Sequence, residues 1–66
     1  MVENLRILRK QQGLTQAALS EKSQVPRICI IRYEAGAHRP GLENAKKLAA
    51  ALGVTVDELI GKEEAS

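Results

Sequence analysis

The spacing of glycine and proline most constrains what this chain can fold into. These residues stand at Gly13, Pro26, Gly36, Pro40, Gly41, Gly53 and Gly61. Glycine tolerates the left-handed backbone that ends many helices, and proline either starts a helix or stops one because it lacks an amide hydrogen. The chain is thereby divided into short pieces, so its fold must be assembled from short elements.

Apolar residues within these pieces recur at helical spacing, three or four positions apart. Leu5 and Leu8 share one side of the first piece, and Ala18 and Leu19 are expected to face inward in the second, for which Thr15 is a good N-cap. In the fourth piece the expected core face comprises Leu42, Ala45, Leu48, Ala49 and Leu52.

The remaining pieces also carry helix signals. Pro26 can start a third helix that Gly36 ends, and Thr55 with Glu58 three residues later forms a capping box for a fifth. The run ICII lies inside the third helical piece, so it does not predict a strand. The sequence therefore predicts an all-α protein, a compact bundle of five short helices.

A chain of 66 residues can form one small domain, in which only about 60% of the unfolded surface becomes buried. Cys29 and His38 are the only residues of their kinds, so neither a disulfide nor a structural zinc site is expected. Helix packing must supply the stability, with dimerisation as a further source. No membrane span or signal peptide is recognisable, and a single thiol fits a cytoplasmic protein.

Basic residues are concentrated in the first part of the chain. Residues 1–40 carry seven Lys and Arg against three Glu, whereas residues 41–66 carry three Lys against five Asp and Glu. The first part is therefore suited to contact a polyanion such as nucleic acid. Ordinary surface charge with a chance asymmetry is the alternative explanation.

The segment VPRICIIRY combines basic and apolar side chains in the third piece. At helical spacing, Ile30 and Tyr33 fall on one side, where we expect them in the core. The outward side then carries Arg27, Ile28 and Arg32, with Ile31 at its edge. A helix with these two faces can pack on the domain and still present charge to a partner.

Two short helices joined by a tight turn, within about 60 residues, are typical of helix-turn-helix domains. The stretch LRILRKQQGLTQAALSEKSQVPRICIIRYEAG, followed by RPGLENAKKLAAALGVTVDELI, resembles the Xre/Cro/lambda-repressor family of DNA-binding domains over residues 4–61. The matching markers are Leu5, Leu8-Arg9, Gly13-Leu14-Thr15-Gln16, Leu19, Ile30, Tyr33-Glu34, Gly36, Pro40 and Leu52-Gly53-Val54. The resemblance implies a lambda-repressor-like fold whose third helix, about residues 26–35, enters the major groove.

The resemblance also implies roles for individual residues. Arg27, Ile28 and Arg32 match base-contact positions; arginine can bond to guanine in bidentate fashion, and Ile28 could pack on a thymine methyl group. The residues that match phosphate-contact positions are Gln16, His38 and Arg39, and Lys10 and Lys46 are weaker candidates. The position of Gln16 is also one that braces the recognition helix in the family. His38 could instead be a solvated loop residue, and Cys29 a small packing residue rather than a reactive thiol.

Arg9 and Glu34 match a family pair that joins the first helix to the third, so we expect a structural ion pair. Three features depart from the family pattern, and one of them is that Ile28 and Ile31 stand where polar residues are common. Gln24 stands where the turn usually has glycine, so either Gln24 accepts a strained conformation or the turn differs. Pro26 stands where a Ser or Thr cap is usual, so one capping bond should be missing.

We therefore predict a helix-turn-helix domain at residues 1–61, a short C-terminal tail at 62–66, and a regulator, expected to be a repressor, that binds double-stranded DNA at the nucleoid. A homodimer is expected, with Val56 or Ile60 as contacts. No catalytic residue, cofactor, metal, small-molecule ligand or membrane partner is predicted, because the sequence contains no matching motif. The alternative is an antitoxin-like or other protein-interaction module that uses an exposed surface of Ile28 and Ile31.

Overall fold

The computed structural model describes residues 3–60, and within this range the chain forms five helices and no strand. They are α1 (Glu3–Gln11), α2 (Gln16–Ser23), α3 (Arg27–Glu34), α4 (Leu42–Leu52) and α5 (Val56–Ile60). The prediction of an all-α bundle of five short helices is confirmed. The predicted tail at 62–66 lies outside the described residues.

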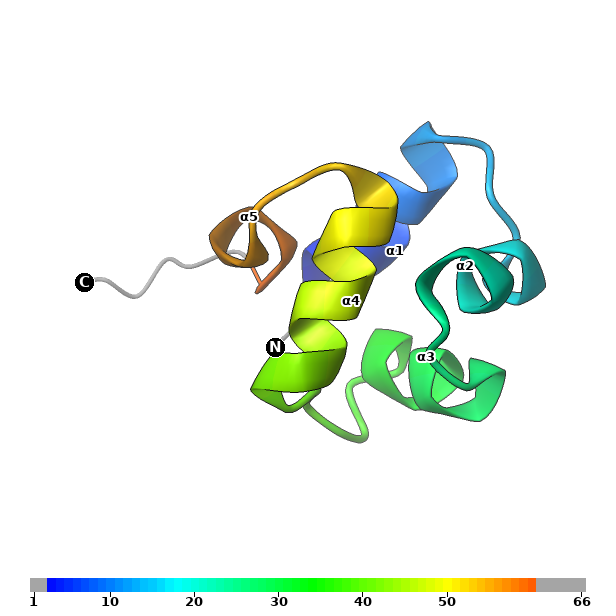
Figure 1. Cartoon of the computed structure of the whole chain (residues 1–66). Coiled ribbons are helices and arrows are strands. Elements are labelled where there is room, and N and C mark those ends of the chain that lie inside the picture. Colours follow the sequence, from blue (N-terminus) through cyan, green and yellow to red (C-terminus); the bar gives the residue numbers. More distant parts are fainter. Residues whose placement is uncertain (1–2, 61–66) are drawn as a thin grey trace.

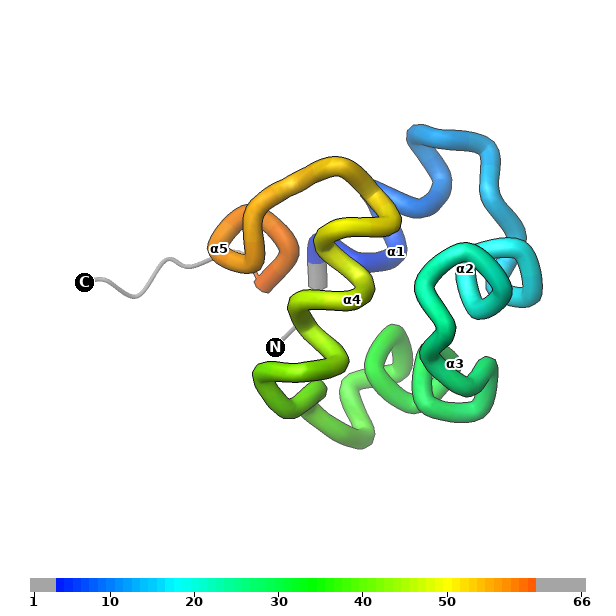
Figure 2. Tube along the Cα trace, in the orientation of Figure 1, coloured from blue at the N-terminus to red at the C-terminus, as the bar shows by residue number. Residues whose placement is uncertain are grey.

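The helices enclose one core, with α4 crossing in front of α1 (Figure 1). α2 and α3 pack together on one side of α4, and α5 packs on the other side against both α4 and α1. The two ends of the described chain thus meet, because α1 and α5 lie side by side (Figure 2). α3 is left with one face against α1 and α2 and another toward solvent.

Every helix contributes one aliphatic side chain that is completely buried. These side chains are Leu5, Leu19, Ile30, Leu48 and Leu59, in the order of the helices. Removing a side chain of this kind from water contributes about 1.5–3 kcal/mol. Tyr33, Val25, Ala45, Ala49 and Leu52 complete the buried core. Of the residues predicted to face inward in α1, α2 and α3, Leu5, Leu19, Ile30 and Tyr33 are therefore buried, whereas Leu8 and Ala18 are only partly buried.

One core prediction was wrong: Leu42 is 65% exposed. Leu42 shares the helical face of Ala45 and Ala49, but it is the first residue of α4. It directly follows the α3–α4 loop, at the start of the helix, and its side chain stays largely in solvent. Helical spacing indicates which face of a helix is apolar, but not how far along the helix that face is covered.

Side-chain caps begin two of the helices as predicted. The Thr15 hydroxyl oxygen accepts the Ala18 amide hydrogen at 3.0 Å, which satisfies one free donor of α2. Before α5, the Thr55 hydroxyl accepts from the Glu58 amide at 3.0 Å and the Glu58 carboxylate accepts from the Thr55 amide at 2.9 Å. These reciprocal bonds form the predicted capping box.

The turn between α2 and α3 forces Gln24 into the left-handed region, with φ 66° and ψ 24°. It is the only residue other than glycine with a positive φ among residues 3–60. Pro26 follows as the N-cap of α3 with φ −55° and makes no capping bond through its side chain, as predicted. The Ser20 hydroxyl donates to the Val25 carbonyl at 2.6 Å, which helps to hold the turn closed.

Replacing Gln24 with glycine should stabilise the protein by about 0.5–1 kcal/mol. Left-handed backbone costs a residue with a Cβ about 1–2 kcal/mol, and the extra freedom of glycine in the unfolded chain offsets part of this gain. Thermal unfolding should show a melting temperature about 2–8 °C higher. Gln24→Ala, which keeps the Cβ, is the control and should give no increase; an equal increase in both variants would contradict the explanation.

Candidate nucleic-acid interface

α3 divides its side chains between the core and the solvent. Ile30 is fully buried and Tyr33 is 6% exposed. The Tyr33 hydroxyl accepts a hydrogen bond from the Asn44 amide at 2.9 Å, so the buried phenol is satisfied and α3 is joined to α4. On the opposite face Ile28 is 51% exposed and Ile31 36%. The inner face of α3 therefore packs against the core, and its outer face remains exposed to solvent.

A partly buried ion pair fixes the C-terminal end of α3. Arg9 Nε donates to Glu34 Oε2 at 2.7 Å and Arg9 Nη2 donates to Oε1 at 3.0 Å, so the pair is bidentate. Arg9 Nη1 also donates to the Leu14 carbonyl at 2.8 Å, in the loop before α2. Arg9 therefore joins α1, the α1–α2 loop and α3.

Gln16 completes this cluster, because its side-chain amide donates to Glu34 Oε1 at 3.1 Å. The first residue of α2 is thereby tied to the last residue of α3, which fixes the angle between the two helices of the motif. One amide hydrogen of Gln16 is used in this bond. A contact from Gln16 to phosphate, as predicted, would use the other hydrogen or the free backbone amides at the start of α2.

The surroundings of Glu34 favour its charged form. Burial by itself raises the pKa of the Glu34 carboxyl, but hydrogen bonds from Arg9 and Gln16 and the positive charges of Arg9 and Arg6 outweigh it, so its pKa is lowered. The hydrogen bond to Glu34 likewise raises the pKa of Arg9. Both groups are charged at neutral pH, and the charged form of each is stabilised by the other.

Acid should therefore remove the contribution of Glu34 to stability. A carboxyl with a pKa lower in the folded than in the unfolded protein stabilises above its unfolded value, about pH 4.5, and loses this as pH falls through its folded value. Urea unfolding from pH 7 to about pH 3 should show the free-energy difference between wild type and Glu34→Gln shrinking below about pH 4.5. A difference independent of pH would contradict this role of the charge.

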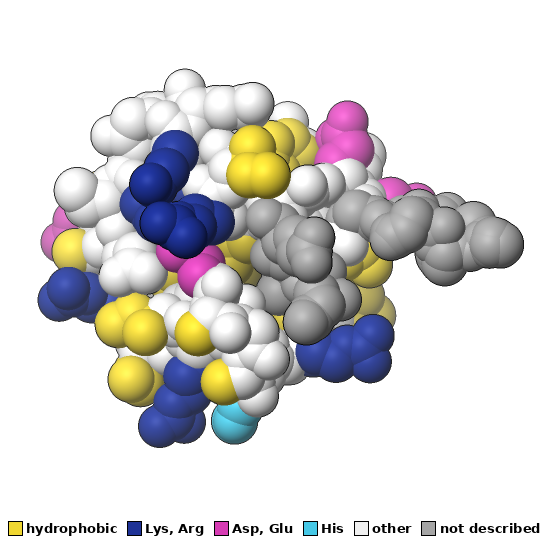
Figure 3. All heavy atoms as spheres, turned by 180° about the vertical axis from the view of Figure 1, so that it is seen from behind, with side chains coloured by type: hydrophobic (Ala, Val, Ile, Leu, Met, Phe, Trp, Pro, Cys, Tyr) yellow, Lys and Arg dark blue, Asp and Glu magenta, His cyan; other side chains and the backbone are white. Residues whose placement is uncertain are grey.

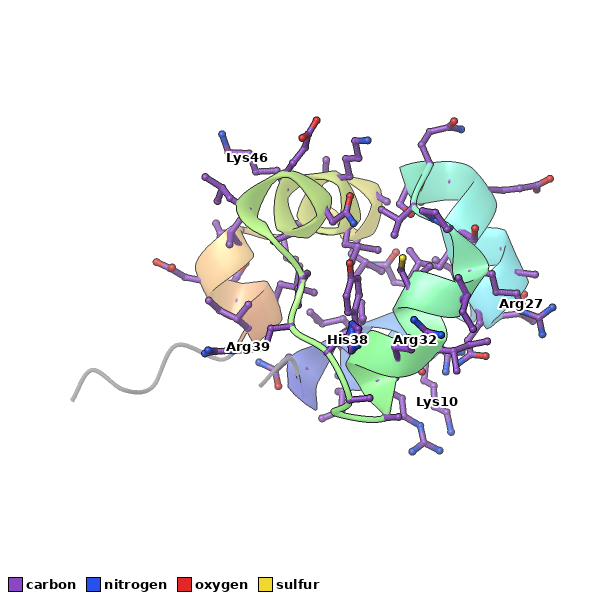
Figure 4. The ribbon with its side chains drawn as sticks, turned by 90° about the horizontal axis from the view of Figure 1, so that it is seen from below. Lys10, Arg27, Arg32, His38, Arg39 and Lys46 are labelled. Carbon is purple, nitrogen blue, oxygen red and sulfur yellow. The ribbon has the colours of Figure 1, made fainter. Side chains whose placement is uncertain are left out.

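The other cations predicted for the site carry no internal partner. Arg27, Arg32, His38 and Arg39 are all exposed, and no hydrogen bond or ion pair joins their side chains to any residue in the described range 3–60. Figure 4 shows them spread in a row across one face, from Arg39 and His38 in the α3–α4 loop to Arg32 and Arg27 on α3. Their charge is therefore available to a ligand.

Lys10 and Lys46 stand apart from this row. Lys46 projects from α4 at one edge of the face and Lys10 from the end of α1 at the other (Figure 4). Neither has an internal partner within the described residues. They therefore lie outside the row formed by Arg27, Arg32, His38 and Arg39.

The surface over α3 is apolar in the middle and basic at its borders. In Figure 3, hydrophobic side chains gather at the lower left, over α3, and Lys and Arg side chains lie on either side of them. In α3 the only acidic residue is Glu34, which is bound to Arg9. An anion approaching the outer face of α3 therefore meets no free carboxylate of this helix.

Two contributors to this arrangement were missing from the sequence-based predictions. Arg6, one turn before Arg9 on α1, adds its charge to the surroundings of Glu34. Val25 is 1% exposed in the turn and anchors the start of α3. The three-residue spacing of Arg6 and Arg9 was a usable signal, whereas nothing in the local pattern marked Val25 as buried.

Three further features of the described part of the chain concern metal binding, membrane-spanning helices and the single cysteine. No group of three His, Cys, Asp or Glu side chains there is arranged to hold a metal ion. No helix among residues 3–60 has the length and apolar character needed to cross a membrane. Cys29 is partly buried and packs against the core, as expected for a small packing residue.

Comparison with known proteins supports the same fold and motif. Residues 5–59 match the model of a helix-turn-helix family. The chain is 39% identical over 62 residues to the HTH-type transcriptional activator BcrR of Enterococcus faecalis, covering 94% of this chain and 30% of BcrR. It is 31% identical over 61 residues to the immunity repressor protein of Bacillus phage phi105, covering 92% and 42% of the two chains.

A third relative is the cryptic phage CTXphi transcriptional repressor RstR of Vibrio cholerae, 35% identical over 60 residues, which cover 91% of this chain and 54% of RstR. The chain therefore spans between about a third and about half of the length of these relatives. No solved structure matches it significantly. With its five helices, its turn and its Arg9–Glu34 pair in place, the chain belongs to the helix-turn-helix family of the Xre/Cro/lambda-repressor type.

Proposed function

We propose that the protein is a transcriptional regulator that binds a specific sequence of double-stranded DNA by inserting α3 into the major groove. The observation that carries this proposal is that α3 has two different faces. Its inner face packs on the core and its end is bound to Arg9 through Glu34, whereas two unpaired arginines lie on its outer face. The major groove is wide enough to admit a helix, and base pairs are distinguishable there. The three relatives are named as transcriptional regulators, which supports the same activity.

Base contacts come from the outer face of α3. Arg27 and Arg32 each present a planar guanidinium that can bond to O6 and N7 of guanine, worth about 1–3 kcal/mol of discrimination per contact. Ile28 lies beside them without a hydrogen-bonding group, so its contribution is apolar. Arginine suits this task better than lysine because its donors are fixed in a fork.

Phosphate contacts come from the flanks of the same face. His38 and Arg39 lie in the loop after α3 (Figure 4). The first backbone amides of α2, next to Gln16, have no acceptor within their own helix. Contacts of this kind set the position of the protein along the duplex without reading its sequence. Arg39 should therefore contribute equally to binding of specific and random DNA.

The functional unit is a homodimer that acts at the nucleoid. One recognition helix reads only a few base pairs, so two copies on half-sites one helical turn apart give useful specificity. Ile60 is 37% exposed at the end of α5, and Val56 is only partly buried. Two of the three relatives are named as repressors, and repression is accordingly the outcome we propose.

Selection from random duplex DNA tests this function directly. The expected winner is an approximately two-fold symmetric site bound at least about a thousandfold more tightly than random DNA. Across a salt series, log K should fall linearly with log salt concentration, since Lys and Arg displace counterions from phosphate. An enriched site without symmetry would contradict the dimer. No enrichment and only weak, salt-sensitive binding would contradict sequence-specific regulation.

A protein-interaction module is the second candidate, because Ile28 and Ile31 expose apolar surface. An antitoxin-like protein of this kind would use the isoleucines to bind its partner, with the arginines at the rim. The two functions predict opposite mutational results. Ile28→Ser should abolish partner binding under the second function, whereas Arg27→Ala and Arg32→Ala together should leave it intact.

A further inference from the structure

The outer face of α3 can read two kinds of chemical group in a groove, and only one of them is polar. Its polar groups are the guanidinium groups of Arg27 and Arg32, since the helix contains no Asn, Gln, Ser or Thr and its one carboxylate is bound to Arg9. The rest of the exposed face is Ile28 and Ile31. α3 therefore lacks the amide side chains that read adenine and the free carboxylate that would read cytosine.

The two isoleucines are exposed without being needed for the core. Ile30 and Tyr33 already fill the buried side of the helix, and the flanking arginines have no internal partner. An apolar patch between unpaired cations fits a polyanion that itself displays an apolar group. The C5-methyl group of thymine is the apolar group that the major groove of unmodified DNA displays.

We infer that Ile28 and Ile31 read C5-methyl groups of pyrimidines, so that the preferred half-site places thymines between the guanines contacted by Arg27 and Arg32. This inference rests on the proposed DNA-binding function and specifies its ligand. Side chains three positions apart on a helix are about 5–6 Å apart, and successive base pairs are about 3.4 Å apart. The pair can therefore cover methyl groups on adjacent base pairs or on pairs one step further apart.

Deoxyuridine tests the inference, because it lacks only the methyl group of thymidine and keeps the same hydrogen-bonding edge. The full chain would be titrated with the duplex selected from random DNA, and with copies in which one thymine at a time is replaced by deoxyuridine. At one or two positions in each half-site the dissociation constant should rise about three- to fivefold, the effect of losing one buried methyl contact. At all other positions it should stay unchanged.

Protein variants assign the effect to the isoleucines. Ile28→Ala and Ile31→Ala should each weaken binding to the thymine site and remove the penalty for deoxyuridine at one position. Both side chains lie on the exposed face, so folding should be preserved, and circular dichroism checks this. Ile28→Val, which keeps a branched apolar side chain, should retain most of the penalty. Leu42→Ala, at an exposed apolar residue of α4, is the matched control and should retain all of it.

The outcomes separate this inference from the function on which it rests. If no duplex is enriched, the proposed function fails. If a site is enriched and depends on Arg27 and Arg32, but deoxyuridine has no effect at any position, methyl reading is refuted and the isoleucines become a protein-binding surface. An unchanged penalty in both Ile28→Ala and Ile31→Ala would also overturn it, because the methyl group would then act through DNA shape.

Discussion

Arg9→Ala should destabilise the protein by about 3–5 kcal/mol, because it leaves the Glu34 carboxylate buried without its charged partner. The Glu34 side chain is only 5% exposed, and the substitution also removes the Arg9 bond to the Leu14 carbonyl. A domain of this size has about 3–10 kcal/mol of total stability, so the variant should be close to unfolding at 37 °C. Circular dichroism should show a melting temperature lower by at least about 12 °C.

Two further variants separate the ion pair from general effects of substitution. Arg6→Ala removes an exposed arginine from the same helix and should cost less than about 1 kcal/mol. Arg9→Met combined with Glu34→Leu removes both charges and should recover most of the loss, since a buried pair is often replaceable by apolar side chains. A double variant as unstable as Arg9→Ala would show that the loss of stability comes from side-chain shape and hydrogen bonding, and not from the unpaired charge of Glu34.

Arg27→Ala combined with Arg32→Ala should abolish preference for the selected site while leaving weak binding to random DNA. Each arginine is assigned about 1–3 kcal/mol of discrimination, so the double variant should lose about 2–6 kcal/mol, roughly 30- to 20,000-fold in affinity for that site. Titration of the selected and random duplexes at the same salt concentration measures the change in affinity for each of them. The melting temperature should stay within about 3 °C of wild type, since both side chains are exposed and unpaired.

Arg39→Ala is the matched comparison, because it removes an equal charge from the loop after α3. It should weaken binding to both duplexes by the same factor and reduce the salt slope by about one. Lys46→Ala, at the edge of the face, should have a smaller effect on both. If the double variant also weakens binding to the selected and the random duplex by the same factor, Arg27 and Arg32 contact phosphate and the assignment of base contacts is wrong.

The helices were predictable because their signals are local. Gly13 and Gly53 mark helix ends through a left-handed backbone, and Thr15 and Thr55 supply caps that depend only on residues three positions away. The inward positions of Ile30 and Tyr33 followed from spacing within α3. Leu42 was wrongly predicted to be buried because its exposure depends on whether another helix covers the first turn of α4. The spacing of apolar residues along one helix carries no such information.

The candidate site was predictable only in part, for a similar reason. Helical spacing identified Arg27, Ile28 and Arg32 as outward-facing, and the family resemblance paired Arg9 with Glu34. The bond from Gln16 to Glu34 joins residues 18 positions apart, so the bracing of α3 by Gln16 was expected only from the family resemblance and not from local spacing. Such an arrangement depends on the angle between two helices, which tertiary packing sets.

The separation of the two faces of α3 has a consequence for how such regulators diverge. Its outer face, Arg27, Ile28, Ile31 and Arg32, takes no part in the ion pair or in the fully buried core. Under the proposed base contacts, one copy of a duplicated gene can therefore change these four codons one at a time and acquire a new target while the core and the ion pair are kept. The same property would let a set of mutually independent switches be built on one scaffold by exchanging only those four side chains.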